Sequence, residues 1–211
     1  MEETKSYWKL IGWLKKQKRI NVVTFYEEVP VNGILELETI DETRRQIIWK
    51  NDPKLLPVLK YERILFFKKD EEIFTLSVIA YDEKEIATTF PEVATEPKLN
   101  RSYVRVKVSP EDDIKVMIEN KELKVEDISE AGIGITGKKE DLFQLQIGKE
   151  YEFLLKIKNE IMKIKGVVVH KETNTAGIKI TDISLKDQDK IARYIMNRQR
   201  EIARKIFMFK D

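Results

Sequence analysis

The interpretation of this sequence turns on two stretches: Arg101-Ser-Tyr-Val-Arg105 and Asp127-Ile-Ser-Glu-Ala-Gly132. The first places two arginines four positions apart at the mouth of a predicted strand. The second is predicted to be a turn between two strands, because Asp and Ser side chains satisfy backbone N–H groups in turns. Each stretch alone is a weak signal, since arginines are plentiful here and Asp-x-Ser-x-x-Gly also fits an ordinary β-turn.

Short strands are predicted on both sides of these stretches, and a helix follows them. The strands are expected at Val104–Val108, Ile114–Ile118, Lys121–Val125, Gly134–Thr136, Glu150–Ile157, Glu160–His170 and Thr175–Ile180. Asn159-Glu160 is predicted to be a hairpin tip. Ser184 and Asp187 form a capping box, which predicts a helix start near Leu185. Ile191, Ile195, Ile202 and Ile206 then recur near one stripe of that helix.

Taken together, in this order and followed by Gly134-Ile-Thr136, the two stretches resemble the PilZ family, whose pattern is Arg-x-x-x-Arg and then [Asp/Asn]-x-Ser-x-x-Gly. Gly148 before a strand, Gly166-Val-Val-Val-His170 and Ala176-Gly-Ile-Lys-Ile180 agree with the later strands of that family. The resemblance covers about half of the chain, including the final helix. It implies a β-barrel that binds a guanine nucleotide, cyclic di-GMP.

By this resemblance, the nucleotide is bound by Arg101, Arg105, Asp127, Ser129 and Gly132. An arginine fork can pair with the O6/N7 edge of guanine or clamp a phosphate, and it can stack on a purine. An aspartate accepts hydrogen bonds from guanine N1–H and N2–H₂. Arg101 and Arg105 would face the same way on a strand, or Arg101 would wrap over the ligand from a loop.

Two further residues lie beside this set. Many relatives carry an additional arginine just before the first motif arginine, where this chain has Asn100. That difference bears on how many nucleotides bind. His170 ends a predicted strand on the ligand side, where it would stack on guanine or be an ordinary surface histidine.

The first half of the chain predicts a helix followed by a second set of strands. Tyr7, Leu10, Ile11 and Leu14 recur at helical spacing within Glu3–Lys18, so this helix packs on its own domain or docks on a membrane or partner. The strands are expected at Val22–Tyr26, Gly33–Ile40, Arg45–Trp49, Arg63–Lys68, Ile73–Tyr81 and Glu85–Thr89. Turn residues such as Asn32-Gly33 and Asn51-Asp52-Pro53 are expected to interrupt them.

Pro91-Glu-Val-Ala-Thr-Glu-Pro97 predicts an extended connector, because proline restricts both itself and the residue before it. We therefore expect one domain at residues 1–97 and a second at residues 98–211. The fold class is mainly β: two small barrels, the first of split-barrel type, with a helix at each end of the chain. This layout resembles YcgR-type proteins. The resemblance implies that the nucleotide binds near the domain junction, reorients the domains and controls a partner such as a flagellar motor or pilus component.

Composition excludes several other classes. The 211 residues include no cysteine, which excludes disulfides and thiolate metal sites. The single histidine argues against a His-based metal centre and a Ser-His-Asp triad. The formal net charge is +2, unlike the marked positive excess of general nucleic-acid binders. No stretch is apolar enough for a membrane span, and the first residues do not form a signal peptide. We expect a cytoplasmic protein without a metal or catalytic cofactor.

Three alternatives remain at this point. A PilZ-like domain without nucleotide binding would act as an adaptor in pilus or flagellar assembly. A nucleic-acid-binding barrel of OB type would need aromatic and basic residues interleaved on one face. Tyr103 beside Arg101, Arg105 and Lys107 is a hint of such a face. A flavin enzyme is disfavoured, because no phosphate-cradling glycine loop, carboxylate pair or nucleophile with a base is present.

Overall fold

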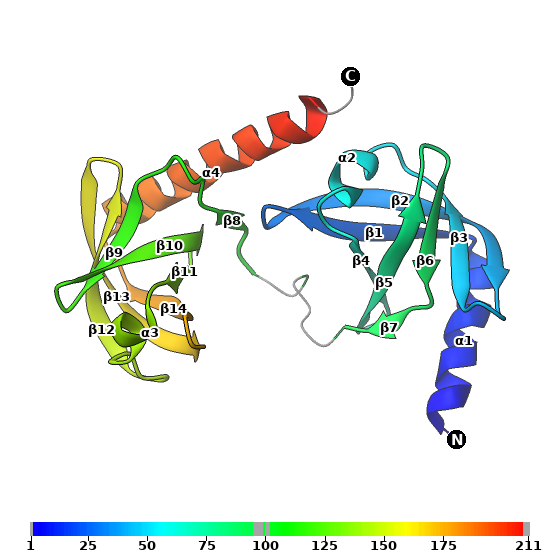
Figure 1. Ribbon diagram of the computed structural model, residues 1–211, viewed down its shortest axis with the longest axis horizontal. Helices are drawn as coiled ribbons and strands as arrows, with labels where there is room; N and C mark the ends of the chain where they lie inside the picture. Colours follow the sequence, from blue (N-terminus) through cyan, green and yellow to red (C-terminus); the bar gives the residue numbers. More distant parts are fainter. Residues whose placement is uncertain (1, 95–98, 100–101, 209–211) are drawn as a thin grey trace. The chain divides into compact units, whose positions relative to one another are not determined.

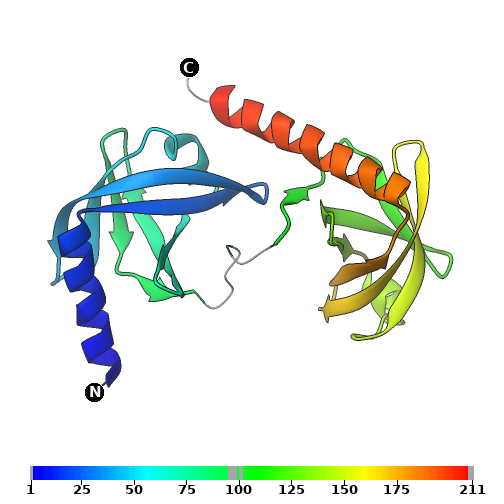
Figure 2. The same ribbon diagram turned by 180° about the vertical axis from the view of Figure 1, so that it is seen from behind.

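The computed structural model describes residues 2–94, 99 and 102–208 (Figure 1). Contacts between Cα atoms divide the chain into two compact units. The first comprises Met1–Tyr26, Pro30–Arg101 and Arg204–Asp211, and the second comprises Glu27–Val29 and Ser102–Ala203. We call these the N-terminal and the C-terminal domain. In the described part of the chain, both are closed β-barrels, as Figures 1 and 2 show.

Helix α1 (Glu2–Gln17) opens the N-terminal domain and packs on it. Leu10, Ile11 and Leu14 are buried in the same apolar cluster as Trp49 and Phe67 of the barrel. The helical spacing of these residues therefore predicted both the helix and the face that it buries.

The N-terminal barrel is built from antiparallel neighbours. Its strands are β1 (Arg19–Tyr26), β2 (Val29–Asp41), β3 (Gln46–Lys50), β4 (Ile64–Lys69), β5 (Glu72–Tyr81) and β6 (Glu85–Thr89). They follow the order β4-β1-β2-β3-β6-β5, and pairing of β4 with β5 closes the barrel. The core has a buried polar pair, since Trp49 Nε1 donates a hydrogen bond of 2.9 Å to Thr88 Oγ1. Pairing satisfies two groups that would otherwise be costly to bury.

The expected turn at Asn32-Gly33 was wrong, because β2 runs through both residues. The chain reverses instead at Glu27 and Glu28, which have φ angles of 48° and 71°. Gly33 has a packing role: a Cβ there would lie 2.6 Å from the side chain of Leu55. A short helix, α2 (Leu56–Leu59), was not predicted, and Pro57 stands in its first turn.

The expected connector begins with a short strand. Strand β7 (Glu92–Val93) pairs with β5 through Phe74 and Thr75, directly after Phe90-Pro91 interrupts the chain beyond β6. Pro97, the second proline of the connector, lies outside the described residues.

The C-terminal barrel repeats this plan with other connections. Its elements are β8 (Arg105–Lys107), β9 (Ile114–Ile118), β10 (Lys121–Ser129), β11 (Gly132–Thr136), a short helix α3 (Lys139–Leu142), β12 (Glu150–Ile157), β13 (Glu160–Lys171) and β14 (Thr175–Asp182). The strand order is β11-β14-β13-β12-β9-β10, closed by pairing of β10 with β11, and β8 pairs with β10. The predicted β12–β13 hairpin is present, but its turn is Lys158-Asn159 and not Asn159-Glu160, since Glu160 already pairs with Ile157. Helix α3 was not predicted.

Helix α4 (Leu185–Met208) ends the described chain, and it begins where the capping box predicted. The Ser184 hydroxyl accepts a hydrogen bond from Asp187 N–H at 3.2 Å. Ile191 and Ile195 are buried against the barrel core, as their spacing predicted. The Tyr194 hydroxyl donates a 2.8 Å hydrogen bond to Asp112, and burial together with that carboxylate raises the pKa of Tyr194.

Over the part of the chain that the structure describes, none of the helices combines the length and the hydropathy that a membrane span requires.

Candidate functional site

The stretch Asp127–Gly132 lies at the end of one barrel hairpin. The prediction of a turn over the whole stretch was wrong, since β10 continues through Asp127 to Ser129 and β11 begins at Gly132. Only Glu130 and Ala131 form the turn. The register shifts between Val125 and Asp127, which places a bulge directly before the aspartate. Bulges re-aim side chains, and here the bulge precedes the residue expected to contact the ligand.

Ser129 holds the hairpin closed. Its side chain is buried, with 5% of the residue exposed, and its hydroxyl donates a hydrogen bond of 3.1 Å to the carbonyl oxygen of Gly132. Ser129 also lies directly opposite Gly132 across the hairpin. The geometry therefore gives Ser129 a supporting role for the turn.

Gly132 is required by packing between strands. A Cβ at this position would lie 2.6 Å from the carbonyl oxygen of Ile178 on β14, closer than a carbon and a backbone oxygen can approach. Only glycine lets β11 pair with β14 at this spacing. The motif glycine thus sets the position of the strand that runs beside Asp127.

Gly134 leaves room for the side chain of Asp127. A Cβ on Gly134 would lie 2.5 Å from Asp127 Oδ2 and 2.8 Å from its Cγ. The Asp127 carboxylate therefore occupies the space that a larger residue at position 134 would fill. Gly134 is a site residue that the sequence did not assign, although Gly132-Ile-Gly134 places two glycines on one face of a strand.

Arg105 and Asp127 are brought together by pairing of β8 with β10. Arg105 lies opposite Ser129 and Lys107 opposite Asp127 in that register. The Arg105 Nη1 atom is 3.2 Å from Asp127 Oδ1, with 37% and 19% of the two side chains exposed. The Asp127 Oδ1 atom itself is buried, so the pair is only partly open to solvent. A ligand would reach it first through Arg105, the more exposed partner.

A row of residues extends from this pair across neighbouring strands. Asp127 is opposite Gly134, Gly134 is opposite Gly177, and Gly177 is opposite His170. At about 4.8 Å per strand, Asp127 and His170 lie roughly 14 Å apart along the sheet. The two residues between them are glycines, and the Asp127 carboxylate lies over the first of them, Gly134.

His170 stands exposed at the far end of the row. Its Nε2 atom lies 3.2 Å from Glu172 Oε1, and 63% of its side chain is exposed. The position is that of a rim residue. It could contact only a ligand that extends over the glycines from Asp127.

Arg101 and Asn100 lie outside the described residues. Ser102 and Tyr103 form a bend, and strand β8 begins only at Arg105, one residue later than the strand predicted from Val104. The arrangement of Arg101 relative to Arg105 stays a prediction.

Basic side chains gather beside Asp127 on the outer face. Lys107 alternates with the buried Val106 and so faces outward like Arg105. Lys179 is opposite Gly132 in the β11–β14 pairing, and it is exposed. The sequence analysis assigned neither lysine to the site, because only the closed barrel brings β8 and β14 to opposite sides of the hairpin.

This arrangement is suited to binding a ligand. An arginine fork, two lysines and one carboxylate around a glycine floor suit a flat ligand that carries both anionic and donor groups. Within the described ranges, no cluster of three or more His, Cys, Asp or Glu side chains could hold a metal ion.

The second half of the chain matches a known family. Residues 99–197 match the model of the PilZ domain. The C-terminal domain is a PilZ domain. The matched residues cover the strands of the C-terminal barrel. They also include the candidate site residues Arg105, Asp127, Ser129, Gly132 and His170.

Whole-chain comparisons extend the likeness to the N-terminal domain. An uncharacterized protein of Aquifex aeolicus (strain VF5) is 25% identical over 219 residues, covering 95% of this chain and 96% of the relative. The structure of MrkH from K. pneumonia in complex with cyclic di-GMP superposes with a TM-score of 0.50 at 16% identity, covering 96% of both chains. YcgR from Escherichia coli, in complex with cyclic di-GMP, gives a TM-score of 0.46 at 12% identity, covering 97% of this chain and 94% of YcgR. At these identities, the likeness to MrkH establishes the fold.

Proposed function

We propose that the protein is a cyclic di-GMP receptor whose ligand lies on the outer face of the PilZ domain, between Arg105 and the glycine floor. The Arg105–Asp127 pair beside Gly134 carries this proposal. It joins an arginine fork and a carboxylate at one end of the row from Asp127 to His170. The ligand seen with MrkH supports the choice of nucleotide.

The two charged groups complement different parts of a guanine nucleotide. The Arg105 guanidinium can form two parallel hydrogen bonds with the O6/N7 edge of guanine, or with a phosphate. The Asp127 carboxylate accepts from N1–H and N2–H₂, which adenine does not offer in this arrangement. The ligand would replace the ion pair between these residues with its own contacts.

The remaining residues shape and extend the site. Ser129 and Gly132 fix the hairpin that carries Asp127, and Lys107 and Lys179 supply positive charge for the phosphates. Arg101 is assigned to the ligand from the Arg-x-x-x-Arg pattern, with Asn100 beside it. His170 would meet the second purine of a ligand that spans the row.

The output of binding is a change in domain arrangement. Arg101 follows Pro97 by four positions in the sequence, so a ligand held by Arg101 would also hold the chain between the two domains. A ligand that binds one arrangement better than another shifts the population toward it. We propose that this shift controls a partner protein, with a flagellar motor or pilus component as the candidate, and that the protein is a receptor without enzymatic activity.

Calorimetric titration with cyclic di-GMP tests this function, with cyclic di-AMP and GTP as competitors for specificity. We expect binding by the guanine dinucleotide alone and a strong loss of affinity in Arg105→Ala. Lys60→Ala is a matched control, because Lys60 is an exposed cation of the N-terminal domain. Absence of binding by the folded wild-type protein would contradict the receptor function and favour a PilZ adaptor.

A further inference from the structure

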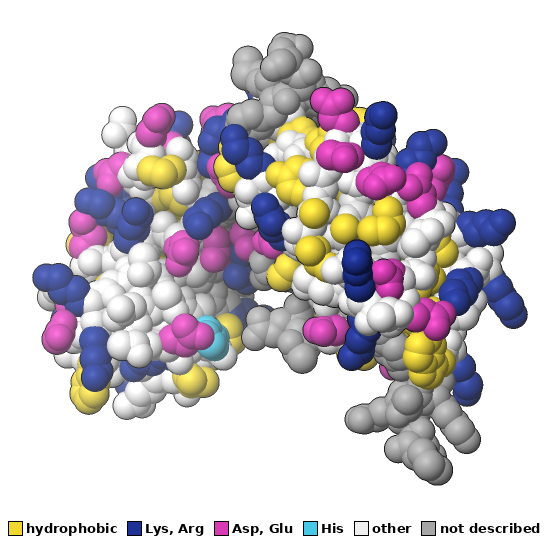
Figure 3. All heavy atoms as spheres, turned by 45° about the vertical axis from the view of Figure 1, so that its right-hand side comes forward, with side chains coloured by type: hydrophobic (Ala, Val, Ile, Leu, Met, Phe, Trp, Pro, Cys, Tyr) yellow, Lys and Arg dark blue, Asp and Glu magenta, His cyan; other side chains and the backbone are white. Residues whose placement is uncertain are grey.

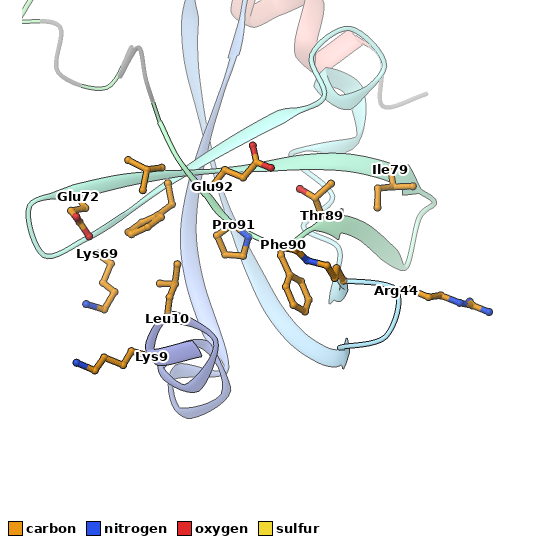
Figure 4. Close-up of a pocket in the computed structure, with 13 residues that line it drawn as sticks. Lys9, Leu10, Arg44, Lys69, Glu72, Ile79, Thr89, Phe90, Pro91 and Glu92 are labelled. Atoms are coloured by element: carbon orange, nitrogen blue, oxygen red, sulfur yellow. The ribbon is translucent and has the colours of Figure 1, made fainter. Parts of the chain in front are cut away.

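A groove of about 770 Å³ lies within the N-terminal domain, next to helix α1 (Figure 4). Its volume falls within the range of ligand-binding sites in proteins. It is formed by α1, the β2–β3 turn, the β4–β5 turn and the segment from β6 to β7. We call it the α1 groove. It belongs entirely to the N-terminal domain and is separate from the proposed nucleotide site.

The floor of the α1 groove is apolar. Leu10, Phe74 and Phe90 line it and are themselves buried, with 4–7% of each residue exposed. Val93 on β7 also lines the groove, and 63% of this residue is exposed. An exposed valine beside a hollow with an apolar floor offers contact area to an apolar side chain from outside.

Basic residues outnumber acidic ones in the lining of the groove, and two of them pair with acidic residues beside it. Four basic residues line it, against two acidic ones, Glu72 and Glu92. The basic residues are Lys9, Arg44, Arg45 and Lys69. Arg44 Nε lies 3.8 Å from Asp41 Oδ2, and Lys69 pairs with Asp70; both are exposed contacts that a ligand can displace at small cost. Figure 4 shows Lys9 and Lys69 at one end and Arg44 at the other, with Leu10 and Phe90 between them.

Local contacts hold these cations in place. The Arg44 N–H donates a 2.9 Å hydrogen bond to Asp41 Oδ1, which fixes the turn that carries both arginines. Arg45 has a φ angle of 54°, as turn residues often do. The Lys69 ammonium group lies 5.9 Å from the centre of the Trp13 ring. The two ends of the groove are therefore set by structured turns.

We propose that the α1 groove binds an acidic segment of a partner protein in which carboxylates flank a large apolar side chain. Positive charge at both ends matches separated carboxylates, and the apolar floor matches the residue between them. Glu92 lies above the middle of the groove in Figure 4, where its carboxylate disfavours an acidic residue at the centre of the bound segment.

A peptide segment fits this charge distribution better than a membrane surface does. Attraction to anionic lipid requires a face dominated by basic residues. Figure 3 instead shows acidic and basic side chains interspersed over the visible face of the N-terminal domain. The excess of positive charge is local to the groove, which suits a ligand that inserts into it.

Selection from a displayed library of random dodecapeptides against the full-length protein tests this inference. We expect enriched peptides with Asp or Glu on both sides of Phe, Leu or Ile. Their affinity, measured by fluorescence anisotropy, should decrease roughly tenfold or more in the double variant Lys9→Glu/Arg44→Glu and should weaken as salt is added. Val93→Thr, which replaces a methyl group with a hydroxyl, should cause a loss of a few-fold.

Lys60→Glu is the control, because it makes a similar charge reversal on an exposed lysine that does not line the groove. It should retain the affinity of the wild type. Enrichment of no acidic sequence, or equal losses in Lys60→Glu, would overturn the proposal. Binding to phosphatidylglycerol vesicles that depends on Lys9 and Arg44, without peptide enrichment, would assign the surface to lipid and likewise overturn it.

Discussion

Gly134→Ala tests whether the position of the Asp127 carboxylate determines nucleotide binding. The new methyl group would lie 2.5 Å from Asp127 Oδ2, whereas ordinary contact requires 3.4 Å or more. The carboxylate must therefore withdraw by about 0.9 Å or rotate away. Either movement separates it from the Arg105 Nη1 atom, which is now 3.2 Å from Oδ1.

The expected effect is large on affinity and small on stability. Loss of hydrogen bonds to a charged group costs about 1.5–3 kcal/mol, which corresponds to a roughly 10- to 150-fold increase in Kd for cyclic di-GMP. Loss of the partly exposed ion pair costs about 1 kcal/mol or less. Removing a glycine from a strand interior returns about 0.5–1 kcal/mol, so the free energy of unfolding should change little.

The assay is calorimetric titration, with urea unfolding as the measure of stability. Gly12→Ala is the control, because it also adds one methyl group to a glycine but lies outside the proposed site, where the methyl group meets nothing within 4 Å. We expect Gly12→Ala to bind cyclic di-GMP like the wild type. Equal losses in the two variants, or unchanged affinity in Gly134→Ala, would refute the assigned role of Asp127.

Three further predictions follow from other parts of the molecule. Gly12→Ala should raise the free energy of unfolding by about 0.5–1 kcal/mol, because a methyl group on this helical residue meets nothing within 4 Å; lowered stability in urea would contradict this. Asp187→Asn should destabilise the protein by about 0.5–1 kcal/mol at neutral pH. The Lys190 ammonium group, and then the Ser184 hydroxyl, lower the pKa of Asp187 below its ordinary value of 3.8, so this stabilisation is present above that value and disappears as the pH falls through the folded-state pKa. A difference between wild type and variant that persisted at pH about 2 would oppose that assignment. Cyclic di-GMP should change the small-angle scattering profile of the wild type but not of Arg105→Ala, and identical profiles with and without ligand would count against domain reorientation.

Most of the fold could be predicted from local patterns. Alternating residues and turn signals predicted β9, β12 and β6 with the bounds that the structure has, and the capping box located the start of α4. These signals act within a few residues, so they require no knowledge of distant contacts. The tight β12–β13 hairpin and the helical spacing in α1 were predicted for the same reason.

The turns that were predicted wrongly contain residues whose role depends on neighbours distant in the sequence. Asn32-Gly33 has a turn composition, but Gly33 is a glycine because Leu55 packs against it. Asp127 and Ser129 also have a turn composition, but pairing with β8 and β11 continues the strand through both. In each case, contacts with residues distant in the sequence outweighed the local preference for a turn.

The candidate site was predictable in its motif residues and not in its surroundings. Arg105 and Asp127 were assigned to one ligand site because the sequence resembles a family pattern. The structure adds the 3.2 Å contact between them. Gly134, Gly177 and Lys179 join the site only because the barrel closes between β10 and β11. That closure is a property of the whole domain, which no short stretch of sequence contains.

Glycine-selective ¹⁵N labelling tests directly whether cyclic di-GMP binds beside the glycines of the PilZ domain. The chain has 8 glycines, and they include Gly132, Gly134 and Gly177. Amide shifts would be recorded by NMR as cyclic di-GMP is added, after assignment by Gly→Ala substitution. We expect large changes in amide shift at these three residues, and none at Gly12 and Gly33 of the N-terminal domain. Changes confined to Gly12 and Gly33, or no change at saturating nucleotide, would contradict binding at this site.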